Sequence, residues 1–172
     1  MVAINKRFHM SHRFICIFFV SSIFAGLGAS AQTDLSGTRI FKGQQSVSGN
    51  LYSNGSPKSV SIKQDAGNIT LSKTTAGNAG DVTSTETVAF NGQTFETITP
   101  SKRKKTITGS WDKDKKTFTE ITHLYDATDS TKLFHTVTDS WTMQNGQLIL
   151  DRKDENASNN EVWESKATYD KQ

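Results

Sequence analysis

Apolar and polar residues alternate along most of the chain beyond residue 35, and this alternation predicts β-strands. Side chains at positions i and i+2 share one face of a strand, so a period of two marks a half-buried strand. No stretch of ten residues has the helical period, which excludes a parallel sheet built from strand–helix–strand units. Strands are expected over residues 38–42, 58–64, 68–74, 82–90, 93–98, 104–111, 117–125, 132–143, 147–153 and 161–169.

Polar turn sequences separate these segments at a regular spacing, which is typical of a β-sandwich or barrel. Asn91-Gly92 and Asn145-Gly146 each stand between two alternating segments. Asn-Gly is the strongest short hairpin signal, because both turn positions need a positive φ. The short links favour an antiparallel up-and-down meander. We therefore expect an all-β fold that closes into a barrel of about eight to ten strands, which leaves few exposed edges and needs only a small core.

The segment 132–143 illustrates how the two faces of a strand differ. One face is rich in threonine and serine and is expected to meet water, whereas the other is apolar with polar insertions. The apolar face carries Leu133, His135, Val137, Asp139, Trp141 and Met143.

The first 31 residues have the features of a secretory signal peptide. Lys6, Arg7 and Arg13 supply a positive start, residues 14–27 form an apolar stretch, and Ala29-Ser30-Ala31 matches a signal-peptidase site. An uncleaved membrane anchor is the alternative, but the apolar stretch is shorter than the roughly 20 residues that span a bilayer. We expect export to a bacterial periplasm or the medium, with residues 32–172 as one β-barrel domain and no membrane span after cleavage.

Removal of this leader changes the charge and the chemistry of the chain. The whole sequence has 20 basic and 17 acidic residues, but three of the basic residues and the only cysteine lie in the leader. The remainder is neutral and free of cysteine, which excludes a disulfide scaffold, a cysteine catalyst and a zinc–thiolate site. It also excludes a globally basic nucleic-acid binder. Apolar residues make up only about 28% of it, so we expect one thin-walled, monomeric β-domain.

Several short motifs resemble the lipocalin-like, calycin-type β-barrels, in particular small exported bacterial domains of unassigned function. The motifs are Leu35-Ser36-Gly37-Thr38, the two Ser-Trp hairpins at 110–120 and 140–151, and the closing Glu161-Val162-Trp163 with Tyr169-Asp170-Lys171. The resemblance implies an antiparallel barrel whose interior holds a small apolar or amphipathic ligand, since a barrel of this size has room for about one such molecule.

Six residues are candidates for the wall of a ligand cavity. The three tryptophans could line a cavity or fill the core, and in a small barrel the two roles can coincide. The polar candidates lie in two neighbouring strands. The full set is Trp111, His123, Tyr125, His135, Trp141 and Trp163.

Two histidines raise the question of a metal site. If the hairpin around Asp129 pairs symmetrically, His123 lies opposite His135, with Cβ atoms about 5 Å apart. Asp139 or Glu120 could then add a third ligand. Two hydrogen-bonded, partly exposed histidines are the simpler interpretation, and we expect neither a metal nor another cofactor.

Two charged segments are best explained as solvated turns and loops. Asp112-Lys113-Asp114-Lys115-Lys116 begins like a calcium loop but has Lys116 where an oxygen ligand is needed. The basic run Ser101–Lys105 could attract an anionic partner, but it lacks the interleaved aromatic residues of a base-stacking surface.

No established catalytic motif occurs in the sequence, so we expect a binding protein rather than an enzyme. Two alternatives remain open. The first is a structural or interaction domain with a filled core and no ligand. The second is an uncharacterised hydrolase, for example one that uses Glu120 and Asp139 as a carboxylate pair inside the barrel.

Overall fold

The computed structural model describes residues 31–49 and 55–172, and the expected signal peptide therefore lies, apart from Ala31, outside the described residues. Ten strands account for most of the rest: β1 (Gly37–Ser48), β2 (Ser59–Gln64), β3 (Asn68–Gly77), β4 (Gly80–Ala89), β5 (Phe95–Ile98), β6 (Lys104–Trp111), β7 (Thr117–Tyr125), β8 (Leu133–Gln144), β9 (Gln147–Asn156) and β10 (Val162–Lys171).

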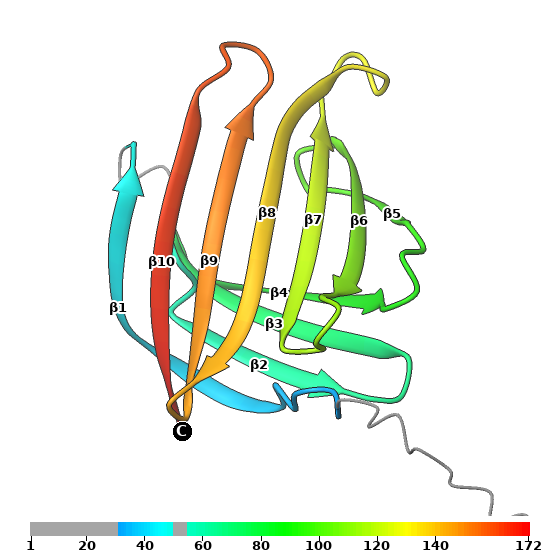
Figure 1. The fold of residues 1–172 in the computed structure, drawn as a ribbon. Helices are drawn as coiled ribbons and strands as arrows, with labels where there is room; N and C mark the ends of the chain where they lie inside the picture. Colours follow the sequence, from blue (N-terminus) through cyan, green and yellow to red (C-terminus); the bar gives the residue numbers. More distant parts are fainter. Residues whose placement is uncertain (1–30, 50–54) are drawn as a thin grey trace, which may run out of the picture.

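The ten strands form one antiparallel sheet in which nearly every strand pairs with its neighbours in the sequence. β1 pairs with both β2 and β10, so the first and last strands meet. The sheet curls into a nearly closed barrel, with β2, β3 and β4 crossing behind the long strands β6 to β10 (Figure 1). The expected all-β meander is confirmed. Within the described part of the chain, no helix has the length and apolar character needed to cross a bilayer.

β1 is longer than the sequence pattern predicts. The alternation ends at residue 42, but the strand continues to Ser48 along β10, with irregular register between Phe41 and Gly43 and again between Ser46 and Ser48. Such bulges interrupt the alternation of faces without ending the strand. This explains why the alternation stops at residue 42 although the strand continues.

The barrel closes between β4 and β6 without a ladder of backbone hydrogen bonds. β4 and β5 are the two end strands of the sheet, and side chains fill the space between β4 and β6. Val88 packs against Gly109, where an added Cβ would lie 2.5 Å from Val88 Cγ1. Above this contact, Lys105 of β6 forms an ion pair with Glu86 of β4.

Most of the apolar core lies in the half of the barrel toward the C-terminus, which is the lower end in Figure 1, and Ile107 extends it upward on β6. At the lower end, the guanidinium of the buried Arg39 donates to Met143 Sδ at 3.7 Å. The fully buried large side chains include Leu35, Ile69, Leu71, Ile107, Phe118, Trp141, Leu148, Leu150 and Tyr169.

Candidate functional site

The inner face of strands β6 to β10 is organised in rows of residues that lie opposite one another on adjacent strands. The lowest complete row is apolar and belongs to the core: Trp111, Phe118, Trp141, Leu150 and Ala167. Inward positions recur every second residue, so the next row up the barrel is two residues away on each strand. The register therefore determines which side chains meet inside the barrel.

The second row carries charges in the middle of the barrel. Glu120 of β7 lies opposite Asp139 of β8, and Asp139 lies opposite Arg152 of β9. Gly109 and Ser165 complete the row on β6 and β10. Only 1% of Glu120 and 3% of Asp139 are exposed. A row of this kind needs compensation, since an unpaired charge is costly away from water.

Lys73 of β3 supplies this compensation from the opposite wall. Its Nζ lies 3.0 and 2.9 Å from the two oxygens of Glu120, and 3.6 Å from Oδ2 of Asp139. Arg152 binds Asp139 with two parallel hydrogen bonds, each 2.7 Å long, from Nε and Nη2. We call these four residues, Lys73, Glu120, Asp139 and Arg152, the charged layer. With two cations and two carboxylates, it is neutral when all four are ionised.

Burial and pairing shift the pKa values of the two carboxyls in opposite directions. Burial raises the pKa of Glu120 above its ordinary value, and the nearby Asp139 adds to this increase although Lys73 opposes it. Burial also acts to raise the pKa of Asp139, but Arg152 and Lys73 outweigh it and hold that pKa below its ordinary value. The asymmetry follows from the bidentate arginine, which forms hydrogen bonds with the carboxylate of Asp139 and none with that of Glu120.

The two cations remain charged for the complementary reason. Burial acts to lower the pKa of Lys73, but the carboxylates of Glu120 and Asp139 outweigh it and raise that pKa. Burial likewise acts to lower the pKa of Arg152, but the carboxylate of Asp139 outweighs it and raises that pKa. The charged layer therefore holds fixed charges that are positioned by one another and by the strand register.

A cavity of about 220 Å³ lies inside the barrel directly above the charged layer. Lys73, Asp139 and Arg152 form its floor. The lining also includes side chains of β6 to β9 and the backbone next to β2: Lys105, Thr122, Val137, Asp154 and Gly55. Several of these side chains are only partly buried, so the cavity connects with solvent at the upper end of the barrel. Its walls are mostly polar.

Asp154 belongs to the upper wall of this cavity and is held by two neighbours, His135 and Trp163, that lie outside the lining. His135 Nδ1 lies 2.6 Å from Asp154 Oδ1. The imidazole stacks on the ring of Trp163 with an interplanar angle of 12° and a centroid distance of 6.2 Å. Trp163 is in turn opposite Asp154 on β10 and β9. This arrangement fixes the carboxylate of Asp154 at the mouth of the cavity.

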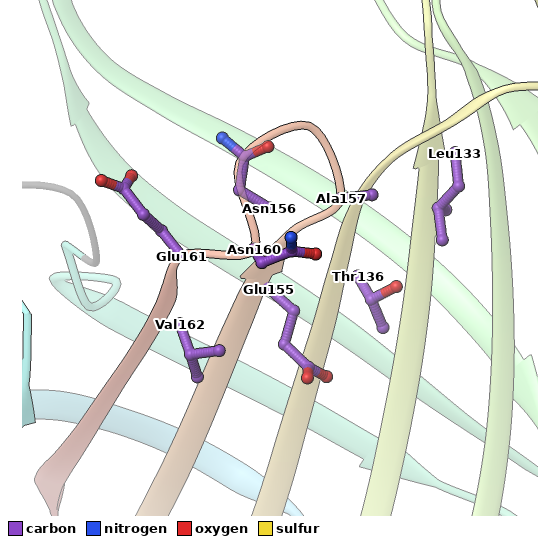
Figure 2. A pocket seen from close by; sticks show the side chains of 8 residues that line it. All are labelled: Leu133, Thr136, Glu155, Asn156, Ala157, Asn160, Glu161 and Val162. Atoms are coloured by element: carbon purple, nitrogen blue, oxygen red, sulfur yellow. The ribbon is translucent and has the colours of Figure 1, made fainter.

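A larger hollow, of about 330 Å³, lies on the outside of the barrel and is separate from this interior site (Figure 2). Thr136, Glu155 and Val162 line it together with residues of the β9–β10 turn. Along their strands these three alternate with His135, Asp154 and Trp163, which face the interior. The outer hollow therefore does not communicate with the cavity through the sheet.

The three tryptophans have different environments. Trp141 is fully buried and Trp111 packs against the core. These two rings therefore fill the barrel rather than line a cavity. Trp163 is half-buried and reaches the cavity wall through His135 and Asp154. Of the six candidates, Trp163 and His135 are the two that lie beside the cavity.

The expected pairing of His123 with His135 is wrong. His123 lies opposite Thr136, and His135 lies opposite Leu124. An irregularity between Leu124 and Tyr125 shifts the register by one residue, which turns the two imidazoles to opposite faces of the sheet. His123 therefore does not line the barrel interior. Among residues 31–49 and 55–172, no group of three or more His, Cys, Asp or Glu side chains could hold a metal ion.

Tyr125 also lies outside the cavity lining, and its environment explains part of the basic run. The Nζ of Lys104 sits 5.3 Å from the centroid of the Tyr125 ring and pairs with Glu96. Arg103 stacks over Phe134 at 4.3 Å, whereas Lys105 points into the barrel. The run is thus divided between two faces and does not form a single anion-binding patch.

The sequence pattern indicated neither Lys73 nor Arg152 as a functional residue. Both lie at inward positions of their strands, and a lysine or arginine at an inward position was a signal that could have been read. Lys73 is 47 residues from Glu120 along the chain, however. Pairing between such distant residues depends on how the sheet curls, which the alternation does not specify.

No family model matches the sequence, and no curated protein matches it. Solved structures with a similar arrangement include zebrafish ileal bile acid-binding protein complexed with cholic acid, with a TM-score of 0.49 and 14% identity over 80% of this chain and 98% of that one. The fatty-acid-binding protein of Manduca sexta has a TM-score of 0.49 and 11% identity over 79% and 98%.

Proposed function

We propose that this chain binds a small amphipathic molecule in the upper half of its barrel. The observation that carries the proposal is the cavity of about 220 Å³ above the charged layer, which has a charged floor and walls that include Val137. Ligand sites are commonly concave, with a few polar groups in fixed positions. Of the two ligand types expected from the sequence, amphipathic and wholly apolar, the polar lining favours the amphipathic one.

The volume limits the size of the ligand. Sites for drug-sized molecules usually measure about 300–1,000 Å³. A cavity of about 220 Å³ suits a smaller molecule, or only the polar end of a longer one whose tail leaves the barrel. The filled lower half, where Trp141 and Tyr169 are fully buried, excludes a ligand from that part of the interior.

The charged layer itself supports binding rather than hydrolysis. The carboxylate pair of the hydrolase alternative, Glu120 and Asp139, does lie face to face inside the barrel. Both carboxylates are bound by cations, however, and Glu120 does not line the cavity. A general acid has to reach the substrate directly or through one water molecule. We therefore propose a non-enzymatic role.

We further propose that the protein works outside the cytoplasm as a monomer, with Met1–Ala31 removed as a signal peptide and residues 32–172 as its single domain. The basic start, apolar stretch and Ala29-Ser30-Ala31 site support export. Intact-mass measurement of secreted or periplasmic protein tests this proposal. A chain that begins at Gln32 is expected, and a full-length chain retained in the cell membrane would contradict it.

Native mass spectrometry of protein purified from its own cells tests the binding function. A retained small molecule is expected for the wild type. Val137→Phe should displace it, because the larger ring occupies the cavity. Val162→Phe makes the same substitution at an exposed position in the outer hollow and should leave the bound molecule in place. If no molecule is retained and no amphipathic probe binds, the proposal is wrong.

A further inference from the structure

We infer that the cavity recognises a cationic group, such as a primary ammonium, on its amphipathic ligand. This inference rests on the proposed binding function and names the chemical class of the ligand. It follows from the balance of charges inside the upper barrel and from one carboxylate, that of Asp154, whose pairing differs from the others.

The ionisable side chains around the cavity do not balance. Five of them line the cavity: the cations Lys73, Lys105 and Arg152, and the carboxylates Asp139 and Asp154. Glu120 and Glu86 lie behind this lining as ion-pair partners of Lys73 and Lys105, so the whole set carries one net negative charge when His135 is neutral. Every one of these side chains is less than 20% exposed.

The excess charge can be assigned to Asp154. Glu120 and Asp139 are bound within the charged layer, and Glu86 is paired with Lys105. The ion-pair partner of Asp154 is His135, which contacts only Oδ1. Asp154 also lines the cavity, so its second oxygen is available to a ligand there. A neutral imidazole donates a hydrogen bond but does not cancel the charge.

Among the residues that the structure describes, the other buried cation is too far away to compensate. Arg39 lies at the lower end, where it contacts Met143. Met143 is six residues from Val137 along β8, which corresponds to roughly 20 Å of strand. The apolar row that contains Trp141 lies between them. The local field at the cavity is therefore set by the side chains around it.

The surroundings of Asp154 also fit the apolar part of such a ligand. Val137 lies directly opposite Asp154 on β8, and Trp163 lies opposite it on β10. An alkyl segment in the cavity can contact Val137, which lines it, while an ammonium group reaches the carboxylate. Aromatic rings favour nearby cations as well. An anionic head group at the same place would meet an uncompensated carboxylate.

Three probes that share one alkyl chain test the inference: octylammonium, octanoate and octanol, titrated calorimetrically into the wild-type protein at neutral pH. Octylammonium should bind at least about tenfold more tightly than octanoate, a difference that a single uncompensated charge can produce. Octanol should fall between them. Binding of octanoate as tight as that of octylammonium, or equal binding of octanol and octylammonium, overturns the cationic preference but leaves the proposed function intact. If none of the three binds, the proposed function fails with it.

Two substitutions of opposite sign locate the charge. Asp154→Asn should weaken octylammonium binding about tenfold or more and leave octanol binding unchanged. Asp151→Asn is the matched control, because Asp151 is on the same strand but faces outward and pairs with Lys166. Lys105→Met removes a cavity cation, so it should strengthen octylammonium binding and weaken that of octanoate. If Asp154→Asn and Lys105→Met each change the affinities for octylammonium and octanoate by the same factor, the inference is wrong.

Discussion

Glu120 and Asp139 lie directly opposite each other on β7 and β8, and a single lysine from the far wall, Lys73, reaches both. The two carboxylates would repel each other strongly without that cation. The charged layer thus joins two parts of the sheet that are distant in sequence. Buried ion pairs often cost as much in desolvation as they return in attraction. We therefore infer that the charged layer serves mainly to position the floor of the cavity.

Substitution of Lys73 should destabilise the protein severely. Lys73→Met leaves Glu120 and Asp139 buried without their shared cation, and loss of one partner of a buried ion pair typically costs about 3–5 kcal/mol. Urea unfolding measures the change. Lys58→Met is the control, because Lys58 and its partner Asp81 are both half-exposed, and it should change the unfolding free energy far less. A small effect of Lys73→Met would contradict the pairing described above.

The unfolding free energy should depend on pH through Glu120. Burial raises its pKa in the folded state above the ordinary value of 4.5, so the folded protein holds this proton more tightly than the unfolded chain. The resulting stability is complete below pH 4.5 and is lost as the pH rises through the folded-state pKa. The variant Glu120→Gln does not lose stability in this way, because glutamine does not ionise. The difference between variant and wild type should therefore shift in favour of the variant as the pH rises above 4.5.

Asp139 contributes with the opposite sign. Burial acts to raise the pKa of Asp139, but Arg152 outweighs it, so this pKa lies below the ordinary value of 3.8. Its stabilisation is present above pH 3.8 and is lost as the pH falls through the folded-state pKa. Denaturant unfolding of the wild type and Glu120→Gln over a range of pH separates the two contributions. Parallel curves above pH 4.5 would show that Glu120 does not titrate as described.

Trp141 should be essential to the core. The ring is fully buried in the apolar row beneath the charged layer. Trp141→Ala is expected to reduce the unfolding free energy by roughly 3–5 kcal/mol, because it removes a large buried side chain and leaves a cavity. Val47→Ala provides an exposed control. A loss below about 1 kcal/mol for Trp141→Ala would be typical of a surface site and would rule out its place in the core.

Gly109 should tolerate no side chain, because β4 packs against it. A Cβ there would lie 2.5 Å from Val88 Cγ1 and 2.8 Å from Phe118 Cζ. Gly109→Ala is expected to cost about 1–3 kcal/mol through overpacking. Adding Val88→Ala should recover part of this loss by removing the first contact. Gly43→Ala is the control in another strand, since nothing lies within 4 Å of its added Cβ. Equal effects of the two alanines would contradict the close packing at Gly109.

The alternation of residues indicated all ten strands, although β1 continues beyond its predicted end and β5 has no buried residue. It was sufficient also for the inner face of β8, where Asp139 and Trp141 are buried as the pattern indicated. It did not reveal the irregularity between Leu124 and Tyr125, which turned His123 outward. A one-residue shift leaves little trace in the sequence of a strand that carries polar residues on both faces.

The candidate site was less predictable than the fold for a related reason. Glu120, Asp139 and Arg152 meet through strand register, which hairpin lengths constrain. Lys73 meets them only because β3 crosses the barrel, and that geometry depends on the curvature of the whole sheet. The sequence indicated the carboxylates as a possible pair but gave no sign of the cations that neutralise them.

The contact between β4 and β6 has a mechanical consequence for the barrel. Adjacent strands elsewhere in the sheet separate only if a ladder of backbone hydrogen bonds breaks. At this seam, separation disrupts the Glu86–Lys105 ion pair and the packing of Val88 on Gly109. Local opening follows the path that breaks the fewest interactions. The wall of the barrel can therefore part along this one line while all nine hydrogen-bonded strand pairings stay intact. Lys105, which belongs to the cavity, would move with it.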